Sequence, residues 1–174
     1  IRVMPESDTP GHTVALRRAY PALDAQHPLN TTDRAEISRA AMDPTNPATL
    51  VFVNRLYAEM ARLFPDPVFH IGGDEVVARQ WLQNSHIAAY MKQHKLADTA
   101  ALQAGFSKQV ALALHARRKT IIGWDEILAA DLPSGTLVQS LRGPRPTLDA
   151  TRAGIGTILF GAYYLDRRLP ARPY

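Results

Sequence analysis

The sequence predicts an α/β fold in which parallel strands alternate with helices, as in part of a (β/α)8 barrel. Five short apolar runs, rich in β-branched or aromatic residues, are separated by longer segments with helical periodicity. Nearly continuous apolar runs suit strands that are buried on both faces. Regular alternation of such strands with helices suits right-handed crossovers within one parallel sheet.

The polar residues that follow the strands favour a barrel over an open sheet. The five strands are predicted at residues 1–4, 68–71, 120–123, 136–138 and 157–160. Acidic, histidine or aromatic side chains follow four of them: Glu6, Asp8 and His12; Asp74 and Glu75; Trp124, Asp125 and Glu126; Tyr163, Tyr164 and Asp166. In a barrel the carboxyl ends of all strands share the active-site face, whereas a doubly wound sheet concentrates its site at one switch point.

Helical periodicity places the connecting segments. Four helices are predicted at residues 50–64, 77–94, 99–114 and 146–154. Pro47 lies near the start of the first, where a missing N–H costs nothing. Thr99 is the predicted N-cap of the third, and Gly154 ends the fourth. The polar, proline-containing segment 22–46 is predicted to be a long loop.

Composition excludes several classes of protein. The 174 residues, 46% hydrophobic and 21% charged, are typical of one globular domain. The formal charge is +4, but the basic residues are scattered, without the clusters of a nucleic-acid surface, so no nucleic-acid partner is predicted. The chain has no cysteine, which excludes disulfides and thiolate metal sites. No apolar run approaches the ~20 residues that span a membrane.

The start of the chain indicates a piece of a longer protein. Residues 1–5 lack the basic and apolar regions of a signal peptide, and the first residue is not Met. We therefore expect residues 1–174 to form a single partial domain. The compartment and the oligomeric state are left open.

The segment 70–75, with the sequence HIGGDE, carries the strongest chemical signal. Two glycines permit a sharp turn and leave space beside the carboxylates of Asp74 and Glu75. Adjacent, partly buried carboxylates repel, so one can keep a proton and act as an acid while the other stays ionised. A turn before an acidic helix N-terminus would explain the same residues without any chemistry.

Four motifs in order resemble glycoside hydrolase family 20, which contains the β-N-acetylhexosaminidases. Residues 70–75 match the family's HIGGDE signature, and residues 6–12 (ESDTPGH) resemble its E-x-D-x-P-G-H at barrel strand three. Residues 123–126 (GWDE) resemble its strand-five motif, and residues 164–166 (YLD) its Y-x-D after strand seven. The resemblance covers essentially the whole chain and implies barrel strands three to seven.

The resemblance implies a retaining hydrolase that removes terminal β-linked GlcNAc or GalNAc without a metal or organic cofactor. Glu75 would be the general acid/base, and Asp74 would hold the N–H of the substrate's 2-acetamido group. The acetamido oxygen, rather than a protein carboxylate, would attack the anomeric carbon, which makes the catalysis substrate-assisted. The implied partner is therefore an amino-sugar glycoside.

Four further residues complete the implied substrate site. Tyr164 would donate its hydroxyl to the acetamido oxygen, and Asp166 would accept a sugar hydroxyl. Trp124 would form a wall against the acetamido methyl or the sugar face. His12 would link Glu75 to an acid from strand two. Taken singly, His12 could instead cap a helix, Trp124 could belong to the core, and Tyr164 with Asp166 could lie in a surface turn.

A metal site is the rival chemistry for the same residues. His12, His70, Asp74 and Glu75 could be drawn as a two-histidine, carboxylate set, but their spacing matches no metal motif and His70 lies inside a strand. No metal is therefore predicted. The remaining acidic side chains of these motifs are interpreted as structural: Glu6, Asp8, Asp125 and Glu126.

Two features depart from the family pattern. Leu141 stands in the sequence VQSLRG, where the family usually has tryptophan. One wall of the acetamido pocket would then be smaller. The lost apolar burial would cost roughly 1–3 kcal/mol of binding free energy. Barrel strands one, two and eight are absent, and five strands cannot close an eight-stranded barrel. A non-catalytic carbohydrate-binding relative or an inactive fragment therefore stays open as an alternative.

Overall fold

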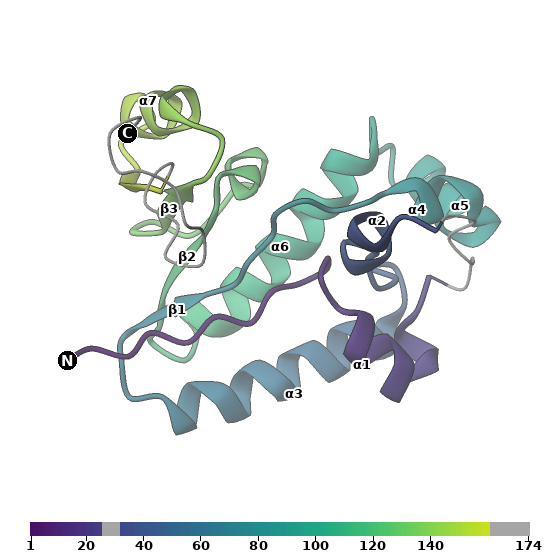
Figure 1. The fold of residues 1–174 in the computed structure, drawn as a ribbon, viewed down its shortest axis with the longest axis horizontal. Helices are drawn as coiled ribbons and strands as arrows, with labels where there is room; N and C mark the ends of the chain where they lie inside the picture. Colours follow the sequence, from purple (N-terminus) through teal and green to yellow (C-terminus); the bar gives the residue numbers. More distant parts are fainter. Residues whose placement is uncertain (26–31, 161–174) are drawn as a thin grey trace.

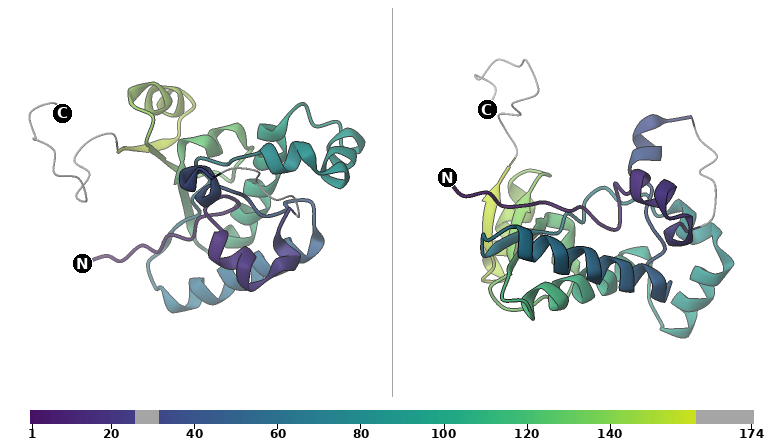
Figure 2. Two further views of the ribbon diagram at one scale, coloured as in Figure 1. Left: turned by 45° about the vertical axis from the view of Figure 1, so that its right-hand side comes forward. Right: turned by 90° about the horizontal axis from the view of Figure 1, so that it is seen from below.

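A computed structural model of the chain describes residues 1–25 and 32–160 (Figures 1 and 2). Four parallel strands form one sheet in the order β1-β2-β3-β4. Their bounds are Val68–His70 for β1, Thr120–Trp124 for β2, Leu137–Ser140 for β3 and Gly156–Leu159 for β4. Because the spatial order follows the chain order, the sheet has no reversal of the kind that defines a doubly wound fold. The prediction of an α/β, partial-barrel fold is confirmed.

Helices connect the strands and cover the sheet. Helix α3 (Pro47–Leu63) precedes β1, α6 (Thr99–His115) precedes β2, and α7 (Pro144–Arg152) joins β3 to β4. Helix α6 contacts β2, α7 contacts both β3 and β4, and α3 lies against α6 (Figure 1). The short 3-10 helix η2 (Asp125–Ala129) lies between β2 and β3. Among the described helices, none is long and apolar enough to cross a membrane.

Local hydrogen bonds determine where these helices begin and end. The Asn46 side chain caps α3. Asp98, rather than the predicted Thr99, caps α6 by accepting a hydrogen bond from the backbone N of Ala101 at 2.8 Å. Gly154, with φ +76°, follows the end of α7 as predicted, because a residue without Cβ tolerates this left-handed conformation.

The predicted strand at residues 1–4 is wrong. The pairing with β1 begins later: the backbone N of His70 donates to the carbonyl of Pro5, and the N of Ser7 donates to the carbonyl of His70, both at 3.0 Å. The first segment therefore runs parallel beside β1 (Figure 1). Glu6 lies opposite His70, so residues 1–3 extend past the start of β1 and pair with no strand in the part of the chain that the structure describes.

The predicted helix 77–94 is divided in two. It forms α4 (Arg79–Gln83) and α5 (Ser85–Gln93), separated by Asn84. Asn84 has extended backbone angles and its side chain accepts hydrogen bonds from the N–H groups of His86 and Ile87. The preference of asparagine for capping a new helix overrides the helical periodicity that runs through residues 77–94.

The segment 22–46 contains more structure than predicted in its described parts. The 3-10 helix η1 (Pro21–Leu23) and helix α2 (Arg34–Ser38) interrupt the expected loop. The additional helix α1 (Val14–Ala19) follows the first motif. These are short helices, whose periodicity is too brief to recognise in a sequence.

Two hydrophobic clusters hold the elements together. The larger lies among α3, α6 and the strands: Met42, Val53, Tyr57, Phe69, Ile71, Phe106, Val110, Ala111, Leu114, Ile121, Ile127, Val138 and Ala150. The smaller includes Trp81, Ile87 and Leu102. Trp81 is fully buried and donates its indole N–H to the carbonyl of Met42 at 3.1 Å. Trp81 is therefore a packing residue of this smaller cluster.

Tyr57 ties the core to the segment beside β1. Its ring is fully buried and packs edge-on against Phe69 at 5.3 Å. Its hydroxyl donates to the carbonyl of Ser7 at 2.5 Å and lies 2.9 Å from the hydroxyl of Thr9. A buried residue of α3 therefore also positions the chain on either side of Asp8.

Tyr57→Phe tests this link. The substitution keeps the ring but leaves the Ser7 carbonyl without its donor, so we expect the free energy of unfolding to fall by about 1–2 kcal/mol. Urea unfolding measures the change. Tyr90→Phe on α5, where the ring is only half-buried, is the matched control. Equal losses for the two variants would show that the Tyr57 hydroxyl contributes nothing particular.

Candidate active site

The predicted catalytic pair lies in the turn that follows β1. Gly72 and Gly73 have φ values of +69° and +96°, and Glu75 also has a left-handed φ of +50°. A Cβ at Gly72 would lie 1.9 Å from Oδ1 of Asp8, so only glycine permits this approach. The turn places its two carboxylates differently: the Asp74 side chain is 11% exposed, whereas the Glu75 side chain is 35% exposed.

Three hydrogen bonds from different elements hold this turn. Gly73 donates its N–H to Oδ1 of Asp8 at 2.8 Å, and its carbonyl accepts from Nε2 of Gln103 in α6 at 2.6 Å. The N–H of Glu75 reaches Oε1 of Glu126 in η2 at 3.5 Å. The carboxylates therefore project from a backbone that is fixed on three sides.

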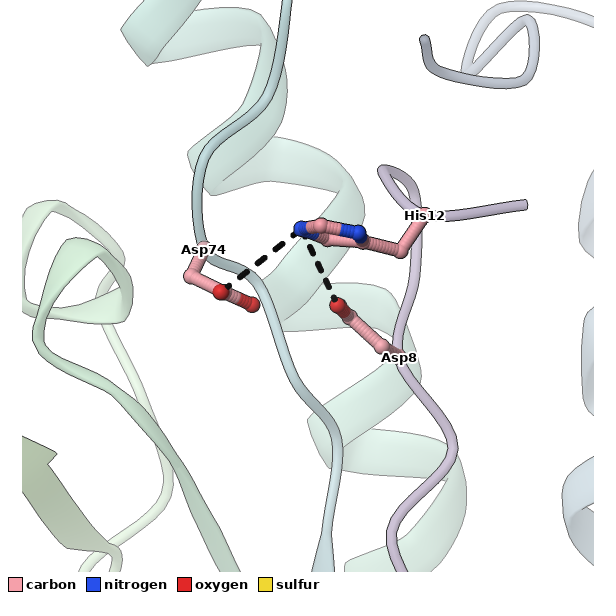
Figure 3. Close-up of side chains that lie close together, drawn as sticks. All are labelled: Asp8, His12 and Asp74. Atoms are coloured by element: carbon pink, nitrogen blue, oxygen red, sulfur yellow. Dashed lines mark ion pairs between the residues drawn. The ribbon is translucent and has the colours of Figure 1, made fainter. Parts of the chain in front are cut away.

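His12 lies among the acidic side chains. Its Nε2 is 3.6 Å from Oε2 of Glu75, 3.8 Å from Oδ2 of Asp74 and 4.0 Å from Oδ2 of Asp8. Figure 3 shows the ring of His12 turned toward Asp8 and Asp74. Thr13, not His12, occupies the cap position of α1. The structure thus brings together three of the predicted site residues, His12, Asp74 and Glu75.

Arg39 supplies a cation at this site that the sequence analysis did not identify. Nε of Arg39 lies 2.8 Å from Oε2 of Glu75, the same oxygen that faces His12. Arg39 belongs to the segment predicted as a polar loop, and no local pattern marks it. Only the folding of that segment against the turn reveals the contact.

Asp8 is a structural partner of the turn, as predicted, but its electrostatic state is unusual. Burial, followed by the nearby charge of Asp74, raises the pKa of Asp8 to about 8, although the hydrogen bond from Gly73 opposes the shift. One side-chain oxygen of Asp8 lies within 4.8 Å of one of Asp74. At neutral pH Asp8 therefore tends to keep its proton, which reduces the negative charge around Asp74.

Trp124 stands at the end of β2 and is half-buried. Its indole N–H donates to Oε1 of Glu6 at 3.0 Å, and its ring meets His70 and Phe160 at centroid distances of 5.3 and 5.6 Å. Burial lowers the pKa of His70, against the charges of nearby acids, and its Nδ1 accepts from the N–H of Gly72 at 3.1 Å. His70 is therefore a neutral packing group, and the 3.4 Å approach of Glu6 to the same nitrogen is not an ion pair.

Asp125 anchors the loop that follows β3. Its buried carboxylate accepts from the hydroxyl of Ser140 at 3.2 Å and from the N–H groups of Leu141 and Arg142 at 3.0 and 3.2 Å. It also pairs with the Arg142 guanidinium. Burial alone would raise the pKa of Asp125, but Arg142 and these hydrogen bonds outweigh it and hold the pKa below its usual value. The structural interpretation of Asp125 is confirmed, and the backbone of Leu141 is fixed at the same end of the sheet.

Tyr164 and Asp166 lie outside the described residues. Their roles against the acetamido oxygen and a sugar hydroxyl stay predictions. The alternative of an ordinary surface turn is equally untested.

The residues that could hold a metal differ from the rival set considered from sequence. Asp8, His12 and Asp74 each offer one ligand atom, and these atoms lie within 4.8 Å of one another. His70 is not among them. That the site works without a metal stays a prediction.

The raised pKa of Asp8 predicts a pH dependence of stability. Between the ordinary value of 3.8 and the folded value of about 8, the folded chain binds more protons than the unfolded chain, so stability falls as pH rises through this window. Asp8→Asn removes the titration but keeps an oxygen for the N–H of Gly73. We expect the wild-type free energy of unfolding to fall by up to about 1.4 kcal/mol per pH unit, and the variant to show a much flatter profile.

Urea unfolding at a series of pH values from 4 to 8 measures both profiles. Asp149→Asn on the surface of α7 is the matched control and should follow the wild type. A slope in Asp8→Asn as steep as in the wild type would contradict the assignment.

Comparisons with known proteins agree with this geometry. Residues 1–173 match the model of the glycosyl hydrolase family 20 catalytic domain. The β-hexosaminidase subunit A1 of Dictyostelium discoideum is 34% identical over 172 residues, which cover 98% of this chain and 32% of that protein. The human β-hexosaminidase subunit beta is 31% identical over 95% of this chain and 31% of its own length. The chain therefore spans about a third of these relatives.

Solved structures give the same result in three dimensions. The chitobiase of Flavobacterium johnsoniae superposes with a TM-score of 0.86 at 34% identity, covering 98% of this chain and 27% of its own. The family 20 exo-β-N-acetylglucosaminidase of Vibrio harveyi, solved in complex with N-acetylglucosamine, gives 0.74 at 27% identity over 90% of this chain and 25% of its own. The chain belongs to the catalytic domain of glycosyl hydrolase family 20.

Proposed function

We propose that this chain carries the catalytic residues of a retaining exo-β-N-acetylhexosaminidase, which removes terminal β-linked GlcNAc or GalNAc. One observation carries the proposal: a half-buried Glu75 stands next to a buried Asp74 in one turn, at 3.6 and 3.8 Å from the same nitrogen of His12. The names of the relatives support the substrate class, as does the N-acetylglucosamine bound to the Vibrio harveyi enzyme.

The unequal exposure of the two carboxylates supports unequal roles. Glu75 is accessible enough to reach a glycosidic oxygen and to exchange protons with water. Asp74 is buried, where a carboxylate interacts more strongly with a neighbouring N–H group because the local dielectric is low. In this proposal Glu75 is the general acid/base and Asp74 orients the 2-acetamido group.

The reaction then proceeds in two steps. Glu75 gives its proton to the glycosidic oxygen as the bond from C1 to that oxygen breaks, and the acetamido carbonyl oxygen bonds to C1 to form an oxazolinium ion. Asp74 stabilises the positive charge that develops on the acetamido N–H. Water then attacks C1, Glu75 accepts its proton, and the ring reopens. Two inversions at C1 give net retention.

The surrounding residues support these two steps. His12 can exchange a proton with Glu75, and a protonated Asp8 limits the negative charge next to Asp74. Trp124 would form an apolar wall for the sugar. Tyr164 would donate to the acetamido oxygen and Asp166 would accept a sugar hydroxyl.

We also propose that residues 1–174 are one partial barrel domain of a longer protein, since the chain matches about a third of its relatives' length. Leu141 is the feature that favours the competing reading of a non-catalytic carbohydrate-binding relative. Its backbone is fixed by Asp125, so the smaller side chain cannot be compensated by a simple shift of the loop.

Glu75→Gln tests the catalytic role. The amide keeps the shape of the side chain but has no acidic proton to give, so we expect kcat/KM on an aryl β-N-acetylglucosaminide to fall by about 10²–10⁴-fold. The measurement uses the full-length protein that contains these residues. Glu59→Gln, an exposed position on α3, is the matched control and should leave the rate unchanged. A wild-type protein that binds GlcNAc without turnover would instead support the alternative of a non-catalytic carbohydrate-binding relative.

The acetamido group provides a second test. Because the substrate supplies the nucleophile, we expect the aryl β-glucoside, which lacks this group, to be cleaved at least about 10²-fold more slowly. Asp74→Asn should lose activity toward the acetamido substrate, while Asp131→Asn, on an exposed carboxylate, should not. Comparable cleavage of both glycosides by the wild type would exclude the substrate-assisted route.

A further inference from the structure

The backbone around Arg39 forms part of the wall of the active site. Its carbonyl accepts a hydrogen bond from the N–H of Val77, two residues after Glu75, at 3.2 Å. The following residues, Ala40 to Met42, are buried, and Ala40 forms a parallel bridge with Val77. The N–H of Met42 donates to the carbonyl of Pro10 at 3.0 Å. Arg39 is therefore held by both segments that carry catalytic side chains.

The guanidinium of Arg39 contacts the carboxylate to which we assign the acid role. Its Nε lies 2.8 Å from Oε2 of Glu75, closer than Nε2 of His12 at 3.6 Å. The side chains of Arg39 and Glu75 are 40% and 35% exposed, so a ligand can approach both. The contact is thus an ion pair at the open side of the site.

Other charged groups face Glu75, but none duplicates Arg39. His12 approaches from the first loop, Glu126 from η2, and Asp74 precedes Glu75 in the chain. Two more ionisable groups lie farther from Glu75: Asp8, at 4.0 Å from Nε2 of His12, and Arg142, at 3.8 Å from Oε1 of Glu126. Within the described part of the chain, Arg39 is the only permanent cation at ion-pairing distance from Glu75.

We propose that Arg39 is a positioning residue for the general acid Glu75, an inference that rests on the function proposed above. A guanidinium keeps its proton at any working pH, so it cannot exchange one with Glu75. It stabilises the carboxylate, which is the form of Glu75 that remains once the proton has passed to the departing oxygen. Arg39 therefore favours proton donation in the transition state and fixes the direction of Oε2.

This role has a consequence that depends on the leaving group. A poor leaving group, such as the second sugar of chitobiose, needs full proton donation, whereas 2,4-dinitrophenolate leaves without it. Removing Arg39 should therefore slow poor leaving groups selectively.

The experiment compares Arg39→Met with the wild type in the full-length protein, on chitobiose and on 2,4-dinitrophenyl β-N-acetylglucosaminide. We expect kcat/KM to fall by about 5–20-fold on chitobiose and by no more than about twofold on the aryl substrate. Arg39→Lys, which keeps the charge but loses the planar group, should retain more activity than Arg39→Met. Arg62→Met, an exposed arginine at the end of α3, is the matched control.

Equal losses on both substrates would overturn the proposal, because a purely structural role predicts that result. If circular dichroism shows that Arg39→Met is misfolded, Arg39→Lys decides: a smaller selective loss on chitobiose supports the role, and an equal loss on both substrates contradicts it. An active Glu75→Gln would instead overturn the proposed function itself. If Glu75→Gln is inactive while the activity of Arg39→Met is unchanged, only the role of Arg39 is overturned.

Discussion

The close approach of Asp8 to the glycine turn is the contact on which the rest of the site depends. The Asp8 carboxylate occupies the space where a Cβ of Gly72 would lie and accepts the N–H of Gly73. This contact joins two segments 65 residues apart in the sequence. The buried hydroxyl of Tyr57 holds the chain just before Asp8, so the contact extends from the turn to the core. The loop that carries His12 is thereby brought within 4 Å of the turn's carboxylates.

The same contact creates the electrostatic difference between the two sides of the turn. On the inner side, Asp8 and Asp74 lie close together, and burial, followed by the charge of Asp74, raises the pKa of Asp8. On the outer side, Glu75 faces solvent together with His12 and Arg39. Adjacent carboxylates in one short motif therefore meet different environments, which is the physical basis for giving them different chemical tasks.

Much of the fold followed from local patterns, and the errors have identifiable causes. The strands in the middle of the chain are short apolar runs, and they form where the sequence placed them. Residues 1–4 have a similar composition, but residues 1–3 lie beyond the start of β1 and pair with no strand among the described residues. The helix predicted over 77–94 divides because the Asn84 side chain satisfies N–H groups of a new helix, a capping effect that competes with apolar periodicity.

The sequence by itself determined the α/β class, the family and the positions of His12, Asp74, Glu75 and Trp124, because these depend on short motifs and their order. Tertiary structure alone decided how these groups interact. The burial of Asp74, the raised pKa of Asp8 and the ion pair of Arg39 with Glu75 arise from contacts between distant segments. Burial and charge proximity are properties of three-dimensional packing, and no pattern along the chain encodes them locally.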